Sequence, residues 1–499
     1  MLQQILDSTK LFLPETTLAA TFCVTLVLGL IRGKKRLFIP TVVLFGLVLT
    51  GIFVVSQATM GTTSIFNGMY AVDPFSVFFK LVILICSMLI VVFSVLSNEL
   101  RVGKRELGEY YSLLVSLTLG MFLMTGASNL LMMYLSLELT SLSSYILAGY
   151  TKEAEDSSEA SLKYVIYGAL SSGMMLYGIS ILYGLTGAVD IYGVNHALGS
   201  GNVDAVPLTI AGILIMVGFG YKISAVPFHF WTPDVYQGAP ITITAFLSVA
   251  SKAAGFAMLI RFLKVSFIDS SAAMLAYGSW SILRGFQWNE VIAILSVLTM
   301  TLGNLVAIWQ DNLKRLLAYS SIAHAGYMLL GITVMSNEGL AAVLIYFVVY
   351  LFMNLGAFYT VMIIANKTGS EDIRDYKGLG YRSPLIAVAM TIFLLALTGI
   401  PPTAGFVGKL YLFAALINAK LFWLAIVGVL NSVVSLYYYV RILRNMFLRE
   451  PEVAAEPLKF SSVQIAVLLV LLIPTLLLGV YFTPLVQYAQ ASVTMVGIR

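Results

Sequence analysis

Residues 207–239 read PLTIAGILIMVGFGYKISAVPFHFWTPDVYQGA. A membrane crossing needs about 20 apolar residues, but a straight helix over this stretch would span about 50 Å. Pro227 and Pro233 interrupt the stretch, and proline inside a helix removes an N–H donor and clashes with the preceding turn. Lys222 and His229 lie beside the first proline. The stretch therefore predicts a broken membrane helix that carries ionisable side chains.

The composition of the whole chain also indicates a membrane protein. Its 499 residues are 59% hydrophobic and 11% charged, with a mean hydropathy of +0.93. A soluble protein of this size cannot bury so much apolar surface, so much of that surface must face lipid. Backbone groups in lipid must bond within the chain, which makes long apolar runs helical. A transmembrane β-barrel would show alternating strands of about ten residues, and the sequence shows none.

The sequence predicts no cofactor, metal or nucleic acid bound by this chain. Cys23 and Cys86 lie in apolar runs without a C-x-x-C pair, and three histidines are too few for much haem chemistry. Gly218 and Gly220 lack the third glycine of a dinucleotide fingerprint. The net charge of +5 reflects where loops lie at a membrane, not a nucleic-acid surface.

Apolar segments predict about fourteen transmembrane helices in an all-α polytopic membrane protein. The first segment has no cleavage signature after it and is expected to be retained. Residues 264–287, which contain Trp280 and Arg284 and are followed by Trp288, are expected to form an interfacial connection. The predicted segments are 13–31, 37–56, 74–97, 110–127, 129–150, 161–186, 207–239, 241–263, 288–310, 315–335, 339–365, 384–419, 421–447 and 462–482.

Lysine and arginine in the loops predict the orientation. The even-numbered loops at 57–72 and 187–206 contain neither residue, so the odd-numbered loops should be cytoplasmic and both termini should lie outside. The expected location is the cell inner (plasma) membrane, with a thylakoid or another energy-coupling membrane as the alternative. The basic residues of the odd loops are Arg32, Lys34, Lys35, Arg36, Arg101, Lys104, Arg105, Lys367, Arg374, Lys377, Arg382, Arg444, Arg449 and Lys459.

A second long segment, 384–419, is interrupted by the sequence GIPPTAG at 399–405. A single break would be a packing kink, but two breaks five segments apart point to repeated transporter halves. Segments 4–8 then match segments 9–13 as two inverted five-helix repeats, with Asn129 and Asn312 at equivalent positions. The predicted units are an N-terminal three-helix segment (1–109), the first repeat (110–263), the connection (264–287), the second repeat (288–447) and a C-terminal helix (448–499).

Several ionisable side chains lie inside predicted membrane helices. A charge at the centre of such a helix costs about 2.5–3.5 kcal/mol on insertion scales. Burial lowers the pKa of a lysine and a nearby carboxylate raises it, so a change of partner can load or release a proton. We predict a relay of such groups, with His229 and His324 able to titrate near neutral pH. The candidate residues are Glu138, Lys163, Lys222, Lys252, His229, His324 and Lys409.

Each candidate also has a structural interpretation. Glu138 and Lys163 are expected to pair, either as part of the relay or as a fixed link between two helices, although buried pairs stabilise poorly. The buried lysines could instead extend to the membrane surface, as expected for Lys80 and Lys264 near helix ends. The histidines could be packing residues. Lys314 and Arg315 are expected to be cytoplasmic anchors, and residues 153–156 to be a solvated loop.

At these residues the chain resembles the antiporter-like proton-pumping subunits of respiratory complex I. The resemblance covers about residues 100–450. Within that family it is most similar to the N-type subunit of NADH-quinone oxidoreductase, because the L type has a long C-terminal lateral helix and the M type has glutamate in place of Lys409. The matching stretches are SEASLKY at 158–164, YKISAVPFHFW at 221–231, NLKRLLAYSSI at 312–322 and GIPPTAGFVGK at 399–409.

The resemblance implies proton translocation coupled to quinone reduction. Glu138 and Lys163 would be the coupling pair, Lys222 the central carrier, Lys252 the link and Lys409 the outward relay. NAD, FMN, iron–sulfur clusters and quinone would belong to partner subunits. Expected partners are a neighbouring antiporter-like subunit, small membrane subunits of complex I and the lipid bilayer. The alternatives are a subunit of a multi-subunit sodium/proton antiporter or membrane-bound hydrogenase, and a structural subunit with an inactive channel.

The predicted topology can be tested with reporter fusions. Fusions at residues 33, 103 and 376 should report a cytoplasmic location, because the basic loops stay inside. Fusions at residues 65 and 195 should report the opposite side. A reversed pattern in two of these loops would contradict the topology.

Overall fold

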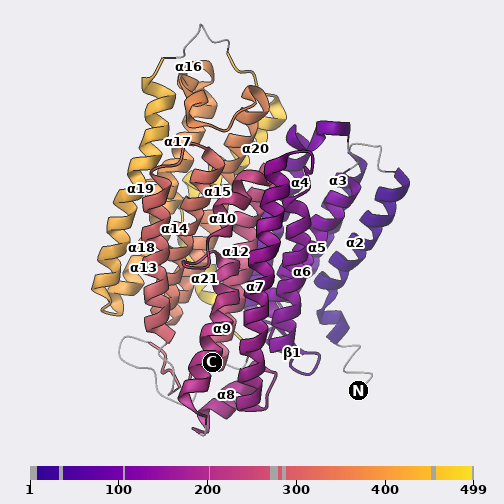
Figure 1. Cartoon of the computed structure of the whole chain (residues 1–499), viewed down its shortest axis with the longest axis vertical. Helices are drawn as coiled ribbons and strands as arrows, with labels where there is room; N and C mark the ends of the chain where they lie inside the picture. The colour runs from indigo at the N-terminus through magenta and orange to yellow at the C-terminus, as the bar shows by residue number, and fades with distance from the viewer. Residues whose placement is uncertain are drawn as a thin grey trace.

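The computed structural model describes residues 8–32, 37–104, 107–201, 203–269, 279–283, 288–450 and 457–496. Long helices lie side by side in one bundle, and most of them run between the same two ends of the molecule (Figure 1). The N-terminal and first-half helices are α2 (Leu13–Arg32), α3 (Phe38–Gln57), α4 (Pro74–Leu96), α5 (Gly108–Gly126), α6 (Leu130–Ala148), α7 (Glu155–Thr186), α8 (Ile191–Gly199), α9 (Ala205–Ile223), α10 (Trp231–Gly238), α11 (Ile241–Phe246) and α12 (Lys252–Phe267).

The second half begins with α13 after the connection. Its long helices are α13 (Trp288–Ala307), α14 (Leu313–Thr333), α15 (Asn337–Thr368), α17 (Pro384–Thr398), α18 (Ala404–Asn418) and α19 (Phe422–Leu448), followed by α20 (Ser462–Val480) and α21 (Thr483–Ala491). Shorter elements are η1 (Glu99–Lys104), the π-helical turn η2 (Leu247–Ser251), η4 (Ile373–Tyr376) and α16 (Leu379–Arg382). A small antiparallel hairpin joins β1 (Thr63–Ile65) to β2 (Tyr70–Val72), with Ser64 opposite Ala71.

The all-α membrane fold is confirmed. Twelve helices of the described chain are long and apolar enough to cross a membrane. Two predicted segments fall outside that set. One is α5, which packs against α2, α4, α6 and α12. The other is the predicted segment 384–419, which the structure divides into two shorter apolar helices, α17 and α18. The fourteen predicted segments therefore each have a counterpart.

The two halves share a local motif that supports the repeat. Asn129 caps α6, and Asn312 caps α14, each through its side-chain oxygen. Each asparagine also forms a β-bridge to the loop that follows the next long helix, Asn129 to Asp190 and Asn312 to Asp372. The helices before those loops, α7 and α15, are equally long and both end at a left-handed glycine. The same elements therefore recur in the same order.

The two repeats run in opposite directions. The end of α5 lies beside the hairpin, because Ala127 bridges Tyr70. The start of α13 lies at this same end, since the Trp288 ring packs on Phe267 at the end of α12. In contrast, the start of α14 lies toward the other end of the bundle, beside the loop after α15, because Asn312 bridges Asp372. The second repeat is therefore inverted, as predicted from the odd number of crossings per unit.

Both predicted helix breaks are confirmed. The first separates α9 from α10, and α9 ends at Ser224 in the left-handed conformation. The second separates α17 from α18 at Gly399, which is also left-handed. A Cβ at Gly399 would meet Lys409 Cδ at 2.8 Å, so the absence of a side chain also leaves room for the lysine. These turns bring Lys222 and Lys409 next to backbone that is not helical.

One prediction about the ends of helices is half right and two are wrong. Helix α7 already begins at Glu155, so the second half of the predicted 153–156 loop is its exposed first turn. Lys80 and Lys264 do not extend to the surface, because both are buried and bonded. Lys80 pairs with Glu15 at 2.6 Å, while Lys264 donates to the Val493 carbonyl at 3.0 Å. Polar groups from distant segments take the place of water in both cases.

The predicted connection is only partly described. Helix α12 continues to Phe267, four residues beyond the predicted end of its segment. Within the connection, Asp269 N donates to Ser281 O, and Trp280 N donates to Met335 O. Arg284 lies outside the described residues, as do the whole basic loop at 33–36 and Arg105.

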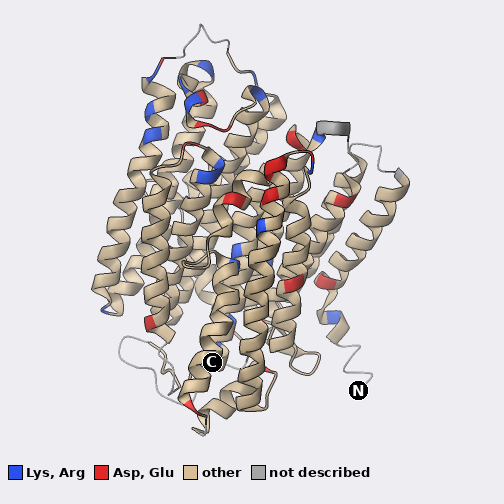
Figure 2. Ribbon diagram, in the orientation of Figure 1, with Lys and Arg blue, Asp and Glu red and all other residues tan. Residues whose placement is uncertain are grey.

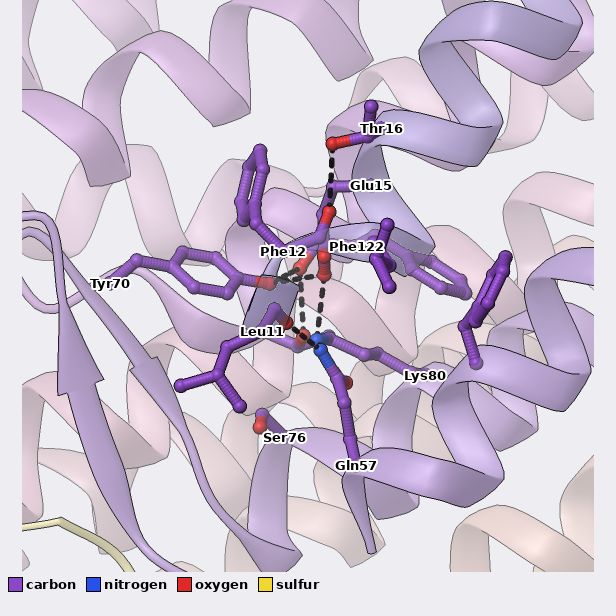
Figure 3. A network of polar contacts seen from close by, with 12 residues as sticks. Leu11, Phe12, Glu15, Thr16, Gln57, Tyr70, Ser76, Lys80 and Phe122 are labelled. Carbon is purple, nitrogen blue, oxygen red and sulfur yellow. Dashed lines mark hydrogen bonds and ion pairs between the residues drawn. The ribbon is translucent and has the colours of Figure 1, made fainter. Parts of the chain in front are cut away.

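The N-terminal helices contain a buried polar network (Figure 3). Glu15 Oε1 accepts hydrogen bonds from Tyr70 Oη at 2.8 Å and from Lys80 Nζ at 2.6 Å. Lys80 also donates to Gln57 Oε1 at 2.9 Å. Because these residues come from α2, α3, α4 and β2, the network joins the whole N-terminal unit.

A second buried ion pair joins this unit to the first repeat. Arg261 of α12 binds both carboxylate oxygens of Asp73 at 2.8 Å, and both side chains are fully buried. Asp73 also caps α4 and accepts from the backbone N–H of Val496. One carboxylate therefore holds α4, α12 and the C-terminal segment together.

We expect Asp73→Asn to destabilise the protein strongly. Removing one partner of a buried pair leaves an uncompensated charge, at a cost of about 3–5 kcal/mol. The measurement is thermal unfolding in detergent. The control is Glu109→Gln at an exposed position, which should change stability by less than about 0.5 kcal/mol. Equal unfolding midpoints for the two variants would contradict this role.

Candidate functional site

Most charged residues lie toward the two ends of the bundle, and a few lie between them (Figure 2). Among the predicted site residues, Lys222, Lys252, Lys409, His229 and His324 are buried. In the part of the chain that the structure describes, Lys222, Lys252 and Lys409 form no ion pair with a carboxylate. They are instead held by neutral hydroxyl and carbonyl groups.

Lys222 lies in the last turn of α9, immediately before the first break. Its Nζ contacts Ser141 Oγ of α6 at 3.4 Å. Ser141 is one turn from Glu138 on the same helix, so Lys222 is directed to the part of α6 that carries the carboxylate. Gly255 of α12 makes room for the lysine, since a Cβ there would lie 3.2 Å from Lys222 Cγ.

Glu138 itself is only partly buried, but its Oε1 atom is buried and has no hydrogen-bond partner among the described residues. An unpartnered carboxylate oxygen in a buried position is costly. Glu138 can therefore accept a further donor, and Lys222 reaches the same part of α6.

The predicted Glu138–Lys163 pair is not formed in this structure. Lys163 Nζ instead binds Asp234 Oδ2 of α10 at 2.6 Å and Glu159 Oε1 at 2.7 Å. The Ser161 hydroxyl donates to the Tyr145 carbonyl, which sets the register of the antiparallel helices α6 and α7. By that register, Lys163 lies about five residues, or roughly 7 Å, along the axis from the level of Glu138. The closer carboxylates of α7 and α10 take the ammonium.

Lys252 follows the π-helical turn η2 without interruption. Such turns are often found at functional sites. Asn354 of α15 donates to Ser248 within this turn at 2.7 Å. Lys252 Nζ donates to the Ser321 carbonyl of α14 at 2.9 Å, so this lysine of the first repeat reaches into the second.

A group of polar side chains continues from that contact toward His324. Tyr350 Oη of α15 donates to Ser321 Oγ at 2.9 Å, and its ring lies 5.1 Å from the His324 ring. His324 Nδ1 shares a 2.7 Å hydrogen bond with Tyr346 Oη. The structure therefore brings Lys252 and His324 into one buried polar cluster on α14 and α15.

Lys409 lies on α18, just after the second break. Its Nζ donates to the Thr398 carbonyl at 2.8 Å and to Ser432 Oγ of α19 at 3.0 Å. The same ammonium lies 4.4 Å from the centre of the Tyr327 ring. Tyr327 lies near His324 on α14, with ring centres 5.9 Å apart, so it lies between the histidine and Lys409.

His229 is not joined to the other candidates. It lies in the turn between α9 and α10, and its Nδ1 atom is buried without a hydrogen-bond partner among the described residues. Its ring packs on Phe230, which is exposed. The structure therefore places His229 at the first break, but apart from the Lys252–His324–Lys409 cluster.

The neutral members of this site and one charged residue were not predicted from the sequence. The neutral residues are Ser141, Ser321, Tyr327, Tyr346, Tyr350 and Ser432, and the charged one is Asp234. Tyr346 and Tyr350 are four residues apart on an apolar helix, a spacing that places them on one face. That signal was available, whereas the partners of Ser321 and Ser432 depend on contacts between helices.

Lys314 and Arg315 also have partners within the protein. Lys314 Nζ is buried and pairs with Glu371 at 3.0 Å, while it also donates to the Ala239 carbonyl. Arg315 binds Asp234 at 2.6 Å. These side chains therefore hold the start of α14 against α10 and the loop after α15.

The described residues contain no group of three or more His, Cys, Asp or Glu side chains placed to hold a metal ion. Cys23 is exposed and Cys86 is buried, and both are free. The candidate residues themselves carry ammonium, carboxylate and imidazole groups, and hydroxyl groups lie beside them.

Known proteins share this architecture and sequence. The NADH-quinone oxidoreductase subunit N 2 of Chloroherpeton thalassium is 50% identical over 97% of this chain and 94% of that protein. The subunit N of Chlorobium chlorochromatii is 44% identical over 99% of this chain and 96% of that protein. A chain of respiratory complex I from Thermus thermophilus with bound aureothin superposes with a TM-score of 0.78 and 29% identity. That match covers 96% of this chain and 99% of that one.

The model of one protein family, described as "NADH:quinone oxidoreductase/Mrp antiporter, TM", matches residues 127–435 of this chain. This region contains both breaks and every candidate residue. The chain belongs to the NADH:quinone oxidoreductase/Mrp antiporter transmembrane family.

Proposed function

We propose that this protein is the N-type membrane subunit of an NADH-quinone oxidoreductase of the complex I type, and that it moves protons across the membrane. The observation that carries the proposal is the set of three buried lysines, Lys222, Lys252 and Lys409, held by neutral groups. A fixed structural charge in an apolar interior is normally paired with an opposite charge. Lysines held by neutral groups are suited to gain and lose a proton.

The arrangement supports transfer in a fixed order. Glu138 and Lys222 form the part of the proton path that lies in the first repeat. Helix α12 packs against α9 and carries Lys252 toward the second repeat. The path from Lys252 to Lys409 is then lined by Ser321, Tyr350, His324 and Tyr327. Hydroxyl groups both donate and accept hydrogen bonds, so they can relay a proton between lysines without carrying a charge themselves.

The redox chemistry is assigned to partner subunits. NAD, FMN, iron–sulfur clusters and quinone would bind there, and the membrane partners would include a neighbouring antiporter-like subunit and small membrane subunits. The relatives named subunit N, which match nearly the whole chain, favour this assignment over a sodium/proton antiporter or hydrogenase subunit. A structural subunit with an inactive channel would require that the buried lysines do not titrate.

We further propose the inner cell membrane as the location, with both termini on the outer side. Two contacts support the placement of the first and last described residues on the same side of the membrane. Ser8 contacts Phe66 of the hairpin, and Val496 contacts Asp73. The basic residues at the α16 end of the bundle (Figure 2) support a cytoplasmic location for that end. The unit boundaries at residues 109, 263, 287 and 447 belong to the same proposal.

Lys222→Ala and Glu138→Ala should each assemble with the other subunits but lose most proton pumping and coupled quinone reduction. Each substitution removes a group that can hold the transferred proton. The measurement is proton uptake and quinone reduction in membranes or proteoliposomes containing the whole complex. Lys459→Ala, at an exposed lysine, is the matched control and should behave like wild type. Wild-type pumping in the two site variants would remove these residues from the mechanism.

Lys409 gives a second test, because its charge and its ability to titrate can be separated. Arginine keeps the charge but does not deprotonate, so Lys409→Arg should lose pumping as Lys409→Ala does. Lys409→Glu should retain more activity than Lys409→Ala, since glutamate also titrates. The measurement is protons pumped per electron pair in assembled complex, with Lys459→Arg as control. If Lys409→Arg pumps like wild type, Lys409 is a fixed charge.

A further inference from the structure

One carboxylate, that of Asp234, joins three helices at the junction of the two repeats. It lies on α10, the short helix after the first break. Its Oδ2 atom binds Lys163 of α7 at 2.6 Å, and its Oδ1 atom binds Arg315 of α14 at 2.6 Å. Lys163 belongs to the first repeat and Arg315 to the second. Asp234 therefore divides its two oxygens between a cation from each repeat.

The position of Asp234 is closely defined by packing. Gly238, one turn later on α10, lies so close to α7 that a Cβ there would meet the Asp156 carbonyl at 2.2 Å and Ala160 Cβ at 2.8 Å. On the other side, Arg315 also binds Gln237 Oε1 of α10 at 3.1 Å. Helix α10 is therefore held between α7 and α14, and a shift of either helix would change the distances from Asp234 to its partners.

The cluster is open to water. The exposed fractions of the Lys163, Asp234 and Arg315 side chains are 37%, 30% and 30%. They line a cavity of about 150 Å³ together with Asp156, Glu159 and Gln237. Ion pairs that are this accessible to solvent add little stability. The cluster therefore does more to direct the Lys163 ammonium than to hold the helices together.

Another carboxylate is available to Lys163. Glu138 has a buried Oε1 atom without a partner among the described residues, and α6 packs directly against α7. The register of the two helices places Glu138 of α6 about five residues, or roughly 7 Å along the helix axis, from the level of Lys163 of α7. A lysine side chain is long and flexible. Lys163 can therefore turn from Asp234 toward Glu138 once Asp234 releases it.

We propose that Asp234 is a positioning residue that holds Lys163 away from Glu138, and that Arg315 ties its release to the second repeat. In the structure Asp234 binds both cations at once. A shift of α14 away from α7 would carry the carboxylate with Arg315 and free the Lys163 ammonium to approach Glu138. When α14 returns, Asp234 recaptures Lys163. The inference rests on the proposed function, since it assumes that Glu138 takes part in proton transfer.

The first experiment separates Asp234 from the other carboxylate that binds Lys163. Asp234→Asn should lower the protons pumped per electron pair at least twofold in assembled complex, while electron transfer to quinone continues. Asp234→Glu keeps the charge and should retain more than half of the wild-type ratio. Glu159→Gln removes the second partner of Lys163, which has no link to Arg315, and should lower the ratio less than Asp234→Asn does. Glu155→Gln, at an exposed carboxylate in the first turn of α7, is the matched control. It should leave the ratio near wild type.

The second experiment separates positioning from simple attachment of the two repeats. The double variant Asp234→Arg with Arg315→Asp re-forms an ion pair between α10 and α14 but places a like charge beside Lys163. If Asp234 only fastens the repeats together, the swap should restore the wild-type ratio. The proposal expects no recovery. A wild-type ratio in the swap, or in assembled Asp234→Asn, would overturn the proposal.

A third measurement does not depend on pumping. The carboxyl band of Glu138 can be assigned in infrared difference spectra as the band lost in Glu138→Gln. Asp234→Asn should shift that band, because the released lysine reaches the carboxylate, and Glu155→Gln should not. An unshifted band would overturn the positioning role even where pumping falls. A shifted band, together with wild-type pumping in Glu138→Ala and Lys222→Ala, would instead refute the proposed function and leave the positioning contact standing.

Discussion

Backbone groups inside a membrane must find hydrogen-bond partners within the protein, and this constraint shapes both broken helices. At the first break, Val226 N donates to Thr299 of α13, and Trp231 Nε1 donates to the Tyr221 carbonyl. At the second, the Thr398 carbonyl accepts from Lys409. The breaks can therefore exist only because side chains from other turns and helices complete them.

The same constraint explains the contacts of the lysines. A helix end inside the protein presents carbonyl oxygens that the helix itself does not satisfy. An ammonium group has three donors and no acceptor, so it suits such a place. Lys409 completes the end of α17 in this way, and Lys252 binds a carbonyl of α14 beside its own π-helical turn. Because neutral groups hold the charge, no fixed carboxylate competes for it.

The junction of the repeats is organised differently. There the side chains are partly exposed and the contacts are ion pairs, with Asp234 between Lys163 and Arg315. Charged contacts that water can reach are exchanged easily, whereas the buried contacts of Lys252 and Lys409 depend on packed helices. The molecule therefore combines a rigid polar interior with a junction at which ion pairs can be rearranged.

The N-terminal unit is attached by a third kind of contact. Asp73 and Arg261 form a fully buried pair, and Asp73 has the further duties of capping α4 and binding the C-terminal segment. The Glu15–Lys80 pair is also fully buried (Figure 3). Buried pairs of this kind define which helices meet more than they add to stability.

The sequence by itself determined the number and type of segments, both breaks, the inverted repeat and the lysines inside the bundle. Hydropathy and proline act locally, so these features can be recognised without knowing the fold. The sequence also contained the stretches at 158–164, 221–231, 312–322 and 399–409 that identify the family.

Only the tertiary structure decided which groups meet. Lys163 was expected to bind Glu138 but binds Asp234, which is 71 residues away in sequence. Lys80 and Lys264 were expected at the surface, but buried groups from α2, α3 and the C-terminal segment receive them. The physical reason is the same in each case. A lysine side chain is long enough to reach several acceptors, and the packing of helices distant in sequence determines which acceptor lies closest.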